Sequence, residues 1–178
     1  MTFAPRIVPS LLVVIAAILD VTIVQRIEIA DASPDVLMLT VSAVALLGGS
    51  IAGAWYGFLG GMVIALAMGL PLGTHAMVAA IIGYWVGRWG EVLVTDEHPA
   101  PPLIAGVLAA GTMQVGYPLV AFLVDPNVHD TSTIWPESLL VASLSAPLAI
   151  PVYLACRKII ALVDAPDAQS GEKAGGEA

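Results

Sequence analysis

The sequence predicts an all-α polytopic membrane protein, built as a six-helix transmembrane bundle. Of the 178 residues, 58% are hydrophobic and only 11% are charged, whereas about 25% of the residues of an ordinary soluble domain are charged. From Val36 to Gly87 the chain contains no Asp, Glu, Lys or Arg. At about 1.5 Å per residue, this stretch is too long for a single crossing of a ~30 Å hydrocarbon core and suits two or three crossings.

Six apolar runs supply the expected spans in chain order. The first run, together with the preceding Arg6, resembles a signal peptide. No small-x-small cleavage motif comes after it, so we expect a retained helix. The second is the weakest, because it gives only about 18 Å of helix, and we expect it to be buried or partly re-entrant. The six runs are Ile7–Val24, Val36–Leu47, Ile51–Met68, Thr74–Trp89, Leu103–Val124 and Pro136–Ile160.

The positions of the cations predict the orientation of the bundle. With the N-terminus in the cytoplasm, the cations on the inner side are Arg6, Arg88, Arg157, Lys158 and Lys173. Only Arg26 then lies outside, which agrees with the enrichment of Lys and Arg in cytoplasmic loops. The tryptophans and tyrosines of the third and fourth spans fall near the same ends, where aromatic rings favour the membrane interface; they are Trp55, Tyr56, Tyr84, Trp85 and Trp89. We therefore expect both termini to lie in the cytoplasm.

The last part of the chain changes character after the sixth span. Pro118, Pro147 and Pro151 interrupt the last two spans, and we expect kinks whose freed carbonyls are satisfied by neighbouring helices. Between the fourth and fifth spans, residues 91–102 form a proline-rich linker. Residues 164–178 are polar and have no apolar period. We expect a single transmembrane domain over 1–163 and a disordered cytoplasmic tail over 164–178.

Small residues recur at every fourth position through the third span. The row consists of Gly49, Gly53, Gly57, Gly61, Ala65 and Gly69. Residues four apart form one ridge of a helix, and a ridge without side chains lets another helix approach closely. A second row, Ala79, Gly83 and Gly87 on the fourth span, would face the first in a hairpin that turns at 69–73. The row serves either this packing within the subunit or a groove shared with a partner helix.

Asp20 is the only aspartate inside an expected span. An ionisable residue within a span is a functional hypothesis by default. One interpretation places its carboxylate near the outer end of the first helix, in reach of water or Arg26. The other gives it a buried hydrogen bond or ion pair, with Gln25 beside it. We expect Asp20, Gln25 and Asp35 to be polar contacts near the outer face, and none of them to be a catalyst.

Several chemical functions lack their motifs. Neither of the two lysines follows a glycine-rich phosphate loop, so no nucleotide site is expected. Ser50 and His75 lack the flanking pattern of an intramembrane serine protease, and a single aspartate within the spans excludes an aspartyl protease that needs two. The histidines are far apart, and Cys156 has no partner for an internal disulfide. We expect no enzyme activity, no cofactor, no metal and no nucleic-acid partner.

The order and spacing of several short motifs resemble those of the rod shape-determining protein MreD family. The motifs are Pro34-Asp35-Val-Leu-Met-Leu, Gly53-Ala54, Gly57-Phe58, Gly61-Met62, Pro71-Leu72-Gly73 with Ala76, Gly83-Tyr84 and Gly87-Arg88, preceded by Gln25. The resemblance covers Gln25 to Arg88, and the last two spans are similar only in hydropathy. One difference stands out: the family typically has an aspartate four residues after the glycine that matches Gly61, and this chain has Ala65.

The resemblance implies a non-enzymatic scaffold subunit of the bacterial elongation machinery, surrounded by membrane lipid. Its implied partners are the single-span protein MreC, the glycosyltransferase RodA with a class B penicillin-binding transpeptidase, and indirectly the actin-like MreB. The resemblance also implies a fold similar to the S-components of energy-coupling-factor (ECF) transporters, which capture vitamins.

Vitamin capture is therefore the alternative function. S-components usually dock through small-xxx-small on the first helix, and here Leu12, Val13, Asp20 and Val21 stand four residues from the two alanines, Ala16 and Ala17. The candidate donors for a vitamin are scattered along the chain: Thr22, Ser42, Thr112, Gln114, Tyr117, Ser143 and Ser145. We therefore expect the scaffold.

Overall fold

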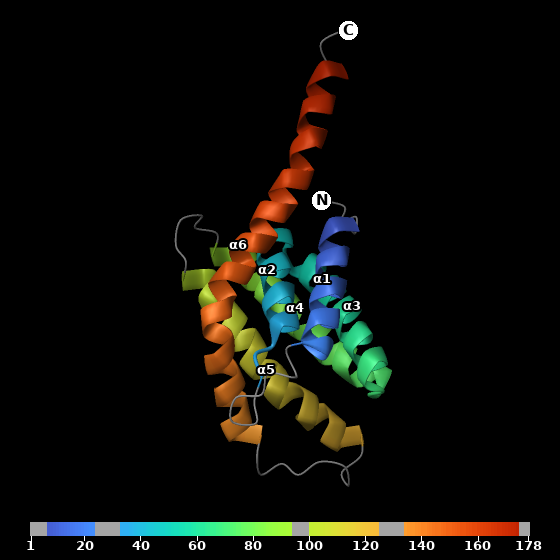
Figure 1. Ribbon diagram of the computed structural model, residues 1–178, viewed down its shortest axis with the longest axis vertical. Helices are drawn as coiled ribbons and strands as arrows, with labels where there is room; N and C mark the ends of the chain where they lie inside the picture. Colours follow the sequence, from blue (N-terminus) through green and yellow to red (C-terminus); the bar gives the residue numbers. More distant parts are fainter. Residues whose placement is uncertain (1–6, 24–32, 94–99, 125–133, 175–178) are drawn as a thin grey trace.

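The computed structural model describes residues 7–23, 33–93, 100–124 and 134–174, without the side chains of 72, 93, 134–137 and 164–174. This part of the chain forms six helices: α1 (Ile7–Thr22), α2 (Val36–Gly48), α3 (Ser50–Met68), α4 (Leu72–Leu93), α5 (Ala100–Val124) and α6 (Ile134–Ala174). Successive helices run in opposite directions through one bundle (Figure 1). The predicted all-α fold is confirmed.

Three of the helices are long and apolar enough to cross a membrane. They are Ser50–Met68, Ala100–Val124 and the part of α6 from Ser138 to Val163. Helices α1 and α2 are also apolar but shorter. The exposed surface of the bundle carries many large aliphatic side chains, as expected where lipid or another helix covers it. The architecture is therefore compatible with a membrane helical bundle.

Helix α2 lies at the centre of the bundle. Every residue from Leu37 to Ala45 is buried, and α2 contacts each of the five other helices. A helix that is apolar on all sides is expected to be buried on all sides. Its 13 residues extend about 20 Å, which is short for a membrane crossing. The prediction of a short, buried second helix is thus confirmed.

Helices α3 and α4 form a tight hairpin at the position that the sequence predicts. Helix α3 ends at Met68, and the next residue, Gly69, has a left-handed φ of 68°, a conformation that glycine adopts without steric cost. The N–H of Leu70 donates to the carbonyl of Ala65 at 2.9 Å, the hydrogen bond that closes many helix C-termini. Pro71 follows, and α4 begins at Leu72.

Helix α1 packs with its small side chains inward. Its buried residues are Pro9, Val13, Ala16, Ala17 and Asp20. The bulky aliphatic residues Ile7, Leu11, Ile15 and Ile18 are exposed on the opposite face. The inward face contacts α2 and α3, so the small residues bring α1 close to the bundle while the large ones remain outside.

Helix α6 is longer than the sequence predicts. The expected span ends at Ile160, whereas α6 continues to Ala174 and projects beyond the bundle, past the end where α1 begins (Figure 1). It therefore enters the 164–178 segment, for which disorder stays a prediction. Helix α4 also runs further than expected, because it ends at Leu93 rather than at Trp89.

Candidate functional site: helix-packing surfaces

Gly53 of α3 and Gly83 of α4 bring two helix backbones into direct contact. A Cβ atom built on Gly53 would collide with the carbonyl oxygen of Gly83, and a Cβ atom on Gly83 would collide with the carbonyl oxygen of Gly53. Both residues are buried. Only glycine fits at these two positions unless the helices move apart.

The same contact repeats along both helices, and we call it the glycine seam. A Cβ atom on Gly57 would meet the carbonyl of Ala79, one on Gly61 would lie 2.6 Å from the Cα of Ala76, and one on Gly87 would meet the carbonyl of Gly49. Ala65, which continues the row, is fully buried. The seam therefore joins Gly49, Gly53, Gly57 and Gly61 of the α3 row to Ala76, Ala79, Gly83 and Gly87 of α4.

Because α4 occupies the small-residue row of α3, the seam is packing within the subunit. A partner helix could use the same row only by displacing α4. The close contacts end at the turn of the hairpin, where Gly69 and Gly73 have nothing within 4 Å of a Cβ position. Of the two interpretations left open by the sequence, the internal one describes the geometry.

Gly60 provides a second close approach that the sequence analysis missed. A Cβ atom there would lie 2.6 Å from Cδ1 of Leu37 on α2 and 2.9 Å from Cγ1 of Val13 on α1. Gly60 comes directly before Gly61, a member of the small-residue row, so it faces a different side of α3. The sequence feature that could have revealed this contact is the pair Gly60-Gly61. Two adjacent glycines leave two neighbouring faces of α3 without a side chain at the same height along the helix.

Asp20 and Asp35 meet at the first turn of α2. The Asp20 carboxylate accepts a hydrogen bond from the N–H of Val36 at 3.0 Å, and the Asp35 carboxylate accepts one from the N–H of Met38 at 2.7 Å. The first N–H groups of a helix have no partner within it, so the two side chains satisfy donors that would otherwise be buried and unpaired. Asp20 is only 6% exposed, which identifies it as a buried hydrogen-bonding residue. Gln25 and Arg26 lie outside the described residues.

Ser145 connects this pair of acids to α6. The N–H of Asp35 donates to Oγ of Ser145 at 3.1 Å, and Ser145 is fully buried. Helices α1, α2 and α6 are thereby joined at one point. Burial, followed by the nearby charge of Asp20, raises the pKa of Asp35, which lies in the linker before α2. Two carboxylates this close disfavour a state in which both are ionised.

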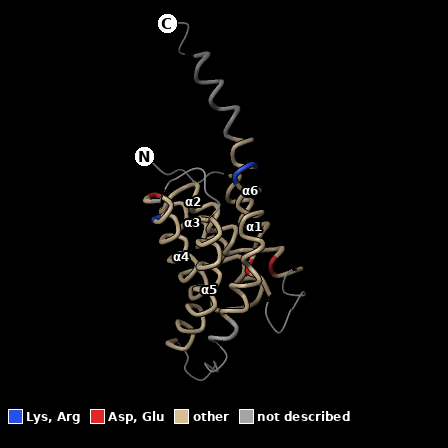
Figure 2. Tube along the Cα trace, turned by 90° about the vertical axis from the view of Figure 1, so that its left-hand side faces the viewer, with Lys and Arg blue, Asp and Glu red and all other residues tan. Residues whose placement is uncertain are grey.

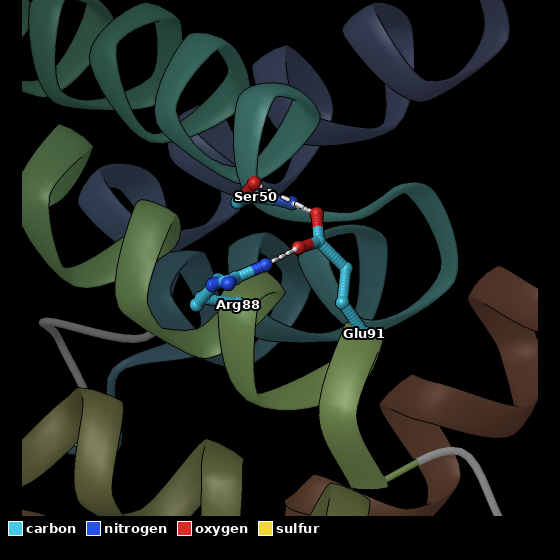
Figure 3. Close-up of polar contacts among 3 residues, drawn as sticks. All are labelled: Ser50, Arg88 and Glu91. Atoms are coloured by element: carbon cyan, nitrogen blue, oxygen red, sulfur yellow. Dashed lines mark hydrogen bonds and ion pairs between the residues drawn. The ribbon is translucent and has the colours of Figure 1, made fainter. Parts of the chain in front are cut away.

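Glu91 of α4 holds the start of α3, which follows the other end of α2. Its Oε1 accepts hydrogen bonds from the N–H and from Oγ of Ser50, both at 2.7 Å, and its Oε2 accepts one from Arg88 at 2.8 Å (Figure 3). Gly49, the residue before α3, has no side chain to cap the helix, and Glu91 supplies the cap from α4.

The sequence analysis placed Glu91 at the start of a linker, and this prediction is wrong. Glu91 lies in the last turn of α4, which ends at Leu93. The polar composition after Trp89 suggested a helix end. The signal for a longer helix was the spacing of Arg88 and Glu91, because oppositely charged residues three apart on a helix are neighbours.

Four exposed aromatic residues border the seam on α3 and α4. They are Trp55, Tyr84, Trp85 and Trp89. The rings of Tyr84 and Trp85 pack edge to face with their centroids 5.8 Å apart, a geometry that aromatic pairs favour. These residues suit either membrane anchoring or a docking surface, and both interpretations stay predictions.

Four of the seven candidate vitamin donors form hydrogen bonds within the bundle. Thr22 donates to the carbonyl of Ile18 at 2.6 Å, Ser42 to Met38 at 2.6 Å and Ser143 to Leu140 at 2.8 Å. Each bond stays within one helix, and Ser145 accepts from Asp35. In the described ranges, no three or more His, Cys, Asp or Glu side chains come together in a group that could hold a metal ion. The site consists of helix contacts.

Comparison with known families yields one match. A family model described as rod shape-determining protein MreD matches residues 2–159. The match extends the sequence resemblance from Gln25–Arg88 to the last two helices, and it includes the glycine seam, the two aspartates and Glu91. Comparisons with curated proteins and with solved structures give no match.

Proposed function

The chain belongs to the MreD family of rod shape-determining membrane proteins, and from this membership we propose that it is a non-enzymatic scaffold of the bacterial elongation complex. In this role it crosses the cytoplasmic membrane several times and binds the single-span protein MreC. The complex positions RodA and its class B transpeptidase, and it connects indirectly to MreB. The subunit needs no cofactor for this function.

The glycine seam is the observation that carries the proposal. Helices α3 and α4 touch through their backbones. Along the seam, no long side chain lies between them that could change rotamer, so the contact fixes the distance between the two helices. Several polar groups of the bundle are engaged within the chain, as Asp35 is with Ser145 and Glu91 with Ser50. The bundle therefore offers other proteins mainly apolar helix faces in a fixed arrangement, which suits a subunit that holds other membrane proteins in place.

We further propose that both termini face the cytoplasm. Successive helices run in opposite directions, so the start of α1 and the projecting part of α6 lie toward the same end of the bundle (Figure 1). The Lys and Arg positions of the described residues also lie toward that end (Figure 2). An excess of Lys and Arg marks the cytoplasmic side of membrane proteins.

Copurification tests the proposed function. The protein is tagged at its C-terminus, extracted gently from its own bacterium, and its partners are identified by mass spectrometry. A tagged, unrelated multi-span protein at the same expression level is the control. Recovery of MreC with RodA and the transpeptidase supports the scaffold. Recovery of an ATPase pair with a coupling membrane subunit would instead identify a vitamin-capture module with an S-component fold.

A further inference from the structure

One face of α6 carries exposed residues at every fourth position, and we call it the α6 ridge. Its members are Leu139, Ser143, Pro147, Pro151, Ala155 and Ile159, and each is exposed. The opposite face of the helix, with Val141, Ser145, Ala149 and Cys156, is buried against the bundle. The α6 ridge therefore points away from the rest of the described chain.

The two prolines leave hydrogen-bond acceptors on the α6 ridge. Proline has no N–H, so Pro147 cannot donate to the carbonyl of Ser143, and Pro151 cannot donate to the carbonyl of Pro147. A helical carbonyl points toward the residue four positions later, and here that residue is an exposed proline. The sequence analysis expected neighbouring helices to satisfy these carbonyls. Both prolines of α6 face outward from the described bundle, so that expectation stays a prediction, and the neighbouring helix would come from outside the described chain.

The freed carbonyls lie within a segment that is apolar enough to span a membrane. The candidate span runs from Ser138 to Val163. Both prolines lie in its uncharged part, which ends before the cations Arg157 and Lys158. Lipid tails have no hydrogen-bond donors, and backbone groups without partners are costly in hydrocarbon. The hydroxyl of Ser143 is already engaged, because it donates to the carbonyl of Leu140 at 2.8 Å.

We propose that the α6 ridge is the docking surface for one transmembrane helix of a partner protein, whose hydroxyl or amide side chains donate to the carbonyls of Ser143 and Pro147. The small residues Ser143 and Ala155 let that helix approach closely. A second copy of this chain fits less well, because two α6 ridges would face each other with acceptors on both sides. The proposal rests on the proposed function, and it places the membrane helix of the single-span subunit on α6.

Site-specific photo-cross-linking tests the location. A photoreactive amino acid replaces Ser143 or Ala155 in the full chain, which is expressed together with the single-span subunit MreC. The control position is Leu108 on α5, which is 50% exposed and belongs to another helix face. We expect cross-links to the single-span subunit from both ridge positions and not from Leu108.

Proline replacement tests the hydrogen bonds. Pro147→Ala and Pro151→Ala each restore a helix N–H, which removes the free acceptor and adds a bond within α6. We expect retention of the single-span subunit to fall about threefold for each variant, since hydrogen bonds between membrane helices are individually weak. The melting temperature of the purified subunit should stay the same or rise, so lost folding cannot explain the result. Pro118→Ala on α5 is the control and should leave retention unchanged.

The outcomes separate the docking surface from the proposed function. If the wild-type chain retains the single-span subunit but cross-links to it only from other helices, the α6 ridge is not the docking surface and the scaffold function stands. If the wild-type chain retains no such subunit, the proposed function fails. Cross-links from the ridge to lipid alone, or to a second copy of this chain at twice its mass, would overturn the inference about the occupant.

Discussion

The carbonyl oxygen of Gly83 occupies the space that a Cβ atom of Gly53 would need, and the relationship holds in reverse. A contact of this kind has no soft side chain that can move aside. Replacement of either residue must shift a helix backbone, whereas replacement of an aliphatic residue in a core usually shifts only neighbouring side chains. The glycine seam is for this reason the part of the bundle that is most sensitive to small changes in volume.

Two glycines on the same helix make a matched test of the seam. Gly83→Ala places a methyl group against the backbone of Gly53, and we expect a loss of stability of about 1–3 kcal/mol, the usual cost of overpacking. Gly73→Ala places the same group in open space, since nothing lies within 4 Å, and should be neutral. Thermal unfolding of the detergent-purified protein measures both. Equal effects of the two variants would show that α3 and α4 do not touch at Gly83.

A larger side chain in the seam should abolish folding. Gly57→Leu would place a branched side chain against the carbonyl of Ala79, and we expect aggregation or loss of the protein from the membrane fraction. Leu66→Ile keeps the volume at an exposed position on the same helix and should be tolerated. Membrane-fraction yield and size-exclusion profiles give the readout. A well-folded Gly57→Leu protein that retains its partners would contradict the packing.

The seam could be predicted from the sequence because it depends on local spacing alone. Gly49, Gly53, Gly57 and Gly61 share one face of any helix that contains them, and Pro71 beside Gly69 marks a turn. These two signals predict a hairpin with one small-residue row opposite another. Gly60 was missed because a search for a four-residue period finds one face of a helix and ignores the others.

The contacts of Asp20, Glu91 and Pro147 depend on how whole helices are placed. Whether Asp20 reaches water depends on the depth of the first turn of α2, which its own helix does not determine. Glu91 was missed because a polar residue after a tryptophan suggests the end of a span. Hydropathy also cannot show which face of α6 turns outward, so the exposure of Pro147 appears only when the helices are assembled.

The Asp35 cap should contribute to stability through its acceptor oxygen. Asp35→Ala removes the hydrogen bond to the N–H of Met38, and we expect a loss of about 0.5–2 kcal/mol, as for other helix caps. Asp35→Asn keeps an acceptor oxygen and should lose less. Thermal unfolding at one pH compares the two variants. Equal losses for the two variants would show that the acceptor oxygen of Asp35 does not stabilise the helix start.

The raised pKa of Asp35 predicts a stability that falls as the pH increases. Burial raises the pKa of this carboxyl in the folded state, so the folded protein keeps a proton that the unfolded chain has released. Stability is then highest below the ordinary aspartate pKa, and it decreases as the pH rises through the raised folded value. Asp35→Asn should flatten this dependence in unfolding experiments across the same pH range. A wild-type stability that increases over this range would contradict the buried position of the carboxyl.

Glu91 should stabilise the α2–α3 junction through Ser50 more than through Arg88. Glu91→Ala removes the acceptor for the N–H and the hydroxyl of Ser50 together with the ion pair to Arg88, and it leaves the start of α3 without a cap. Arg88→Gln removes only an ion pair between exposed side chains, and such pairs contribute little. We therefore expect a clear drop in melting temperature for Glu91→Ala and a small one for Arg88→Gln.

A double-mutant cycle separates the two contacts of Glu91. Ser50→Ala removes the hydroxyl donor, and in the Glu91→Ala background it should cost less than in the wild type, because residues that share a hydrogen bond are not additive. The Arg88→Gln and Ser50→Ala changes should be closer to additive, since the two residues bond different oxygens of the carboxylate. Additive effects of Ser50→Ala and Glu91→Ala would mean that the two side chains do not interact, and the cap of α3 would have to come from another group.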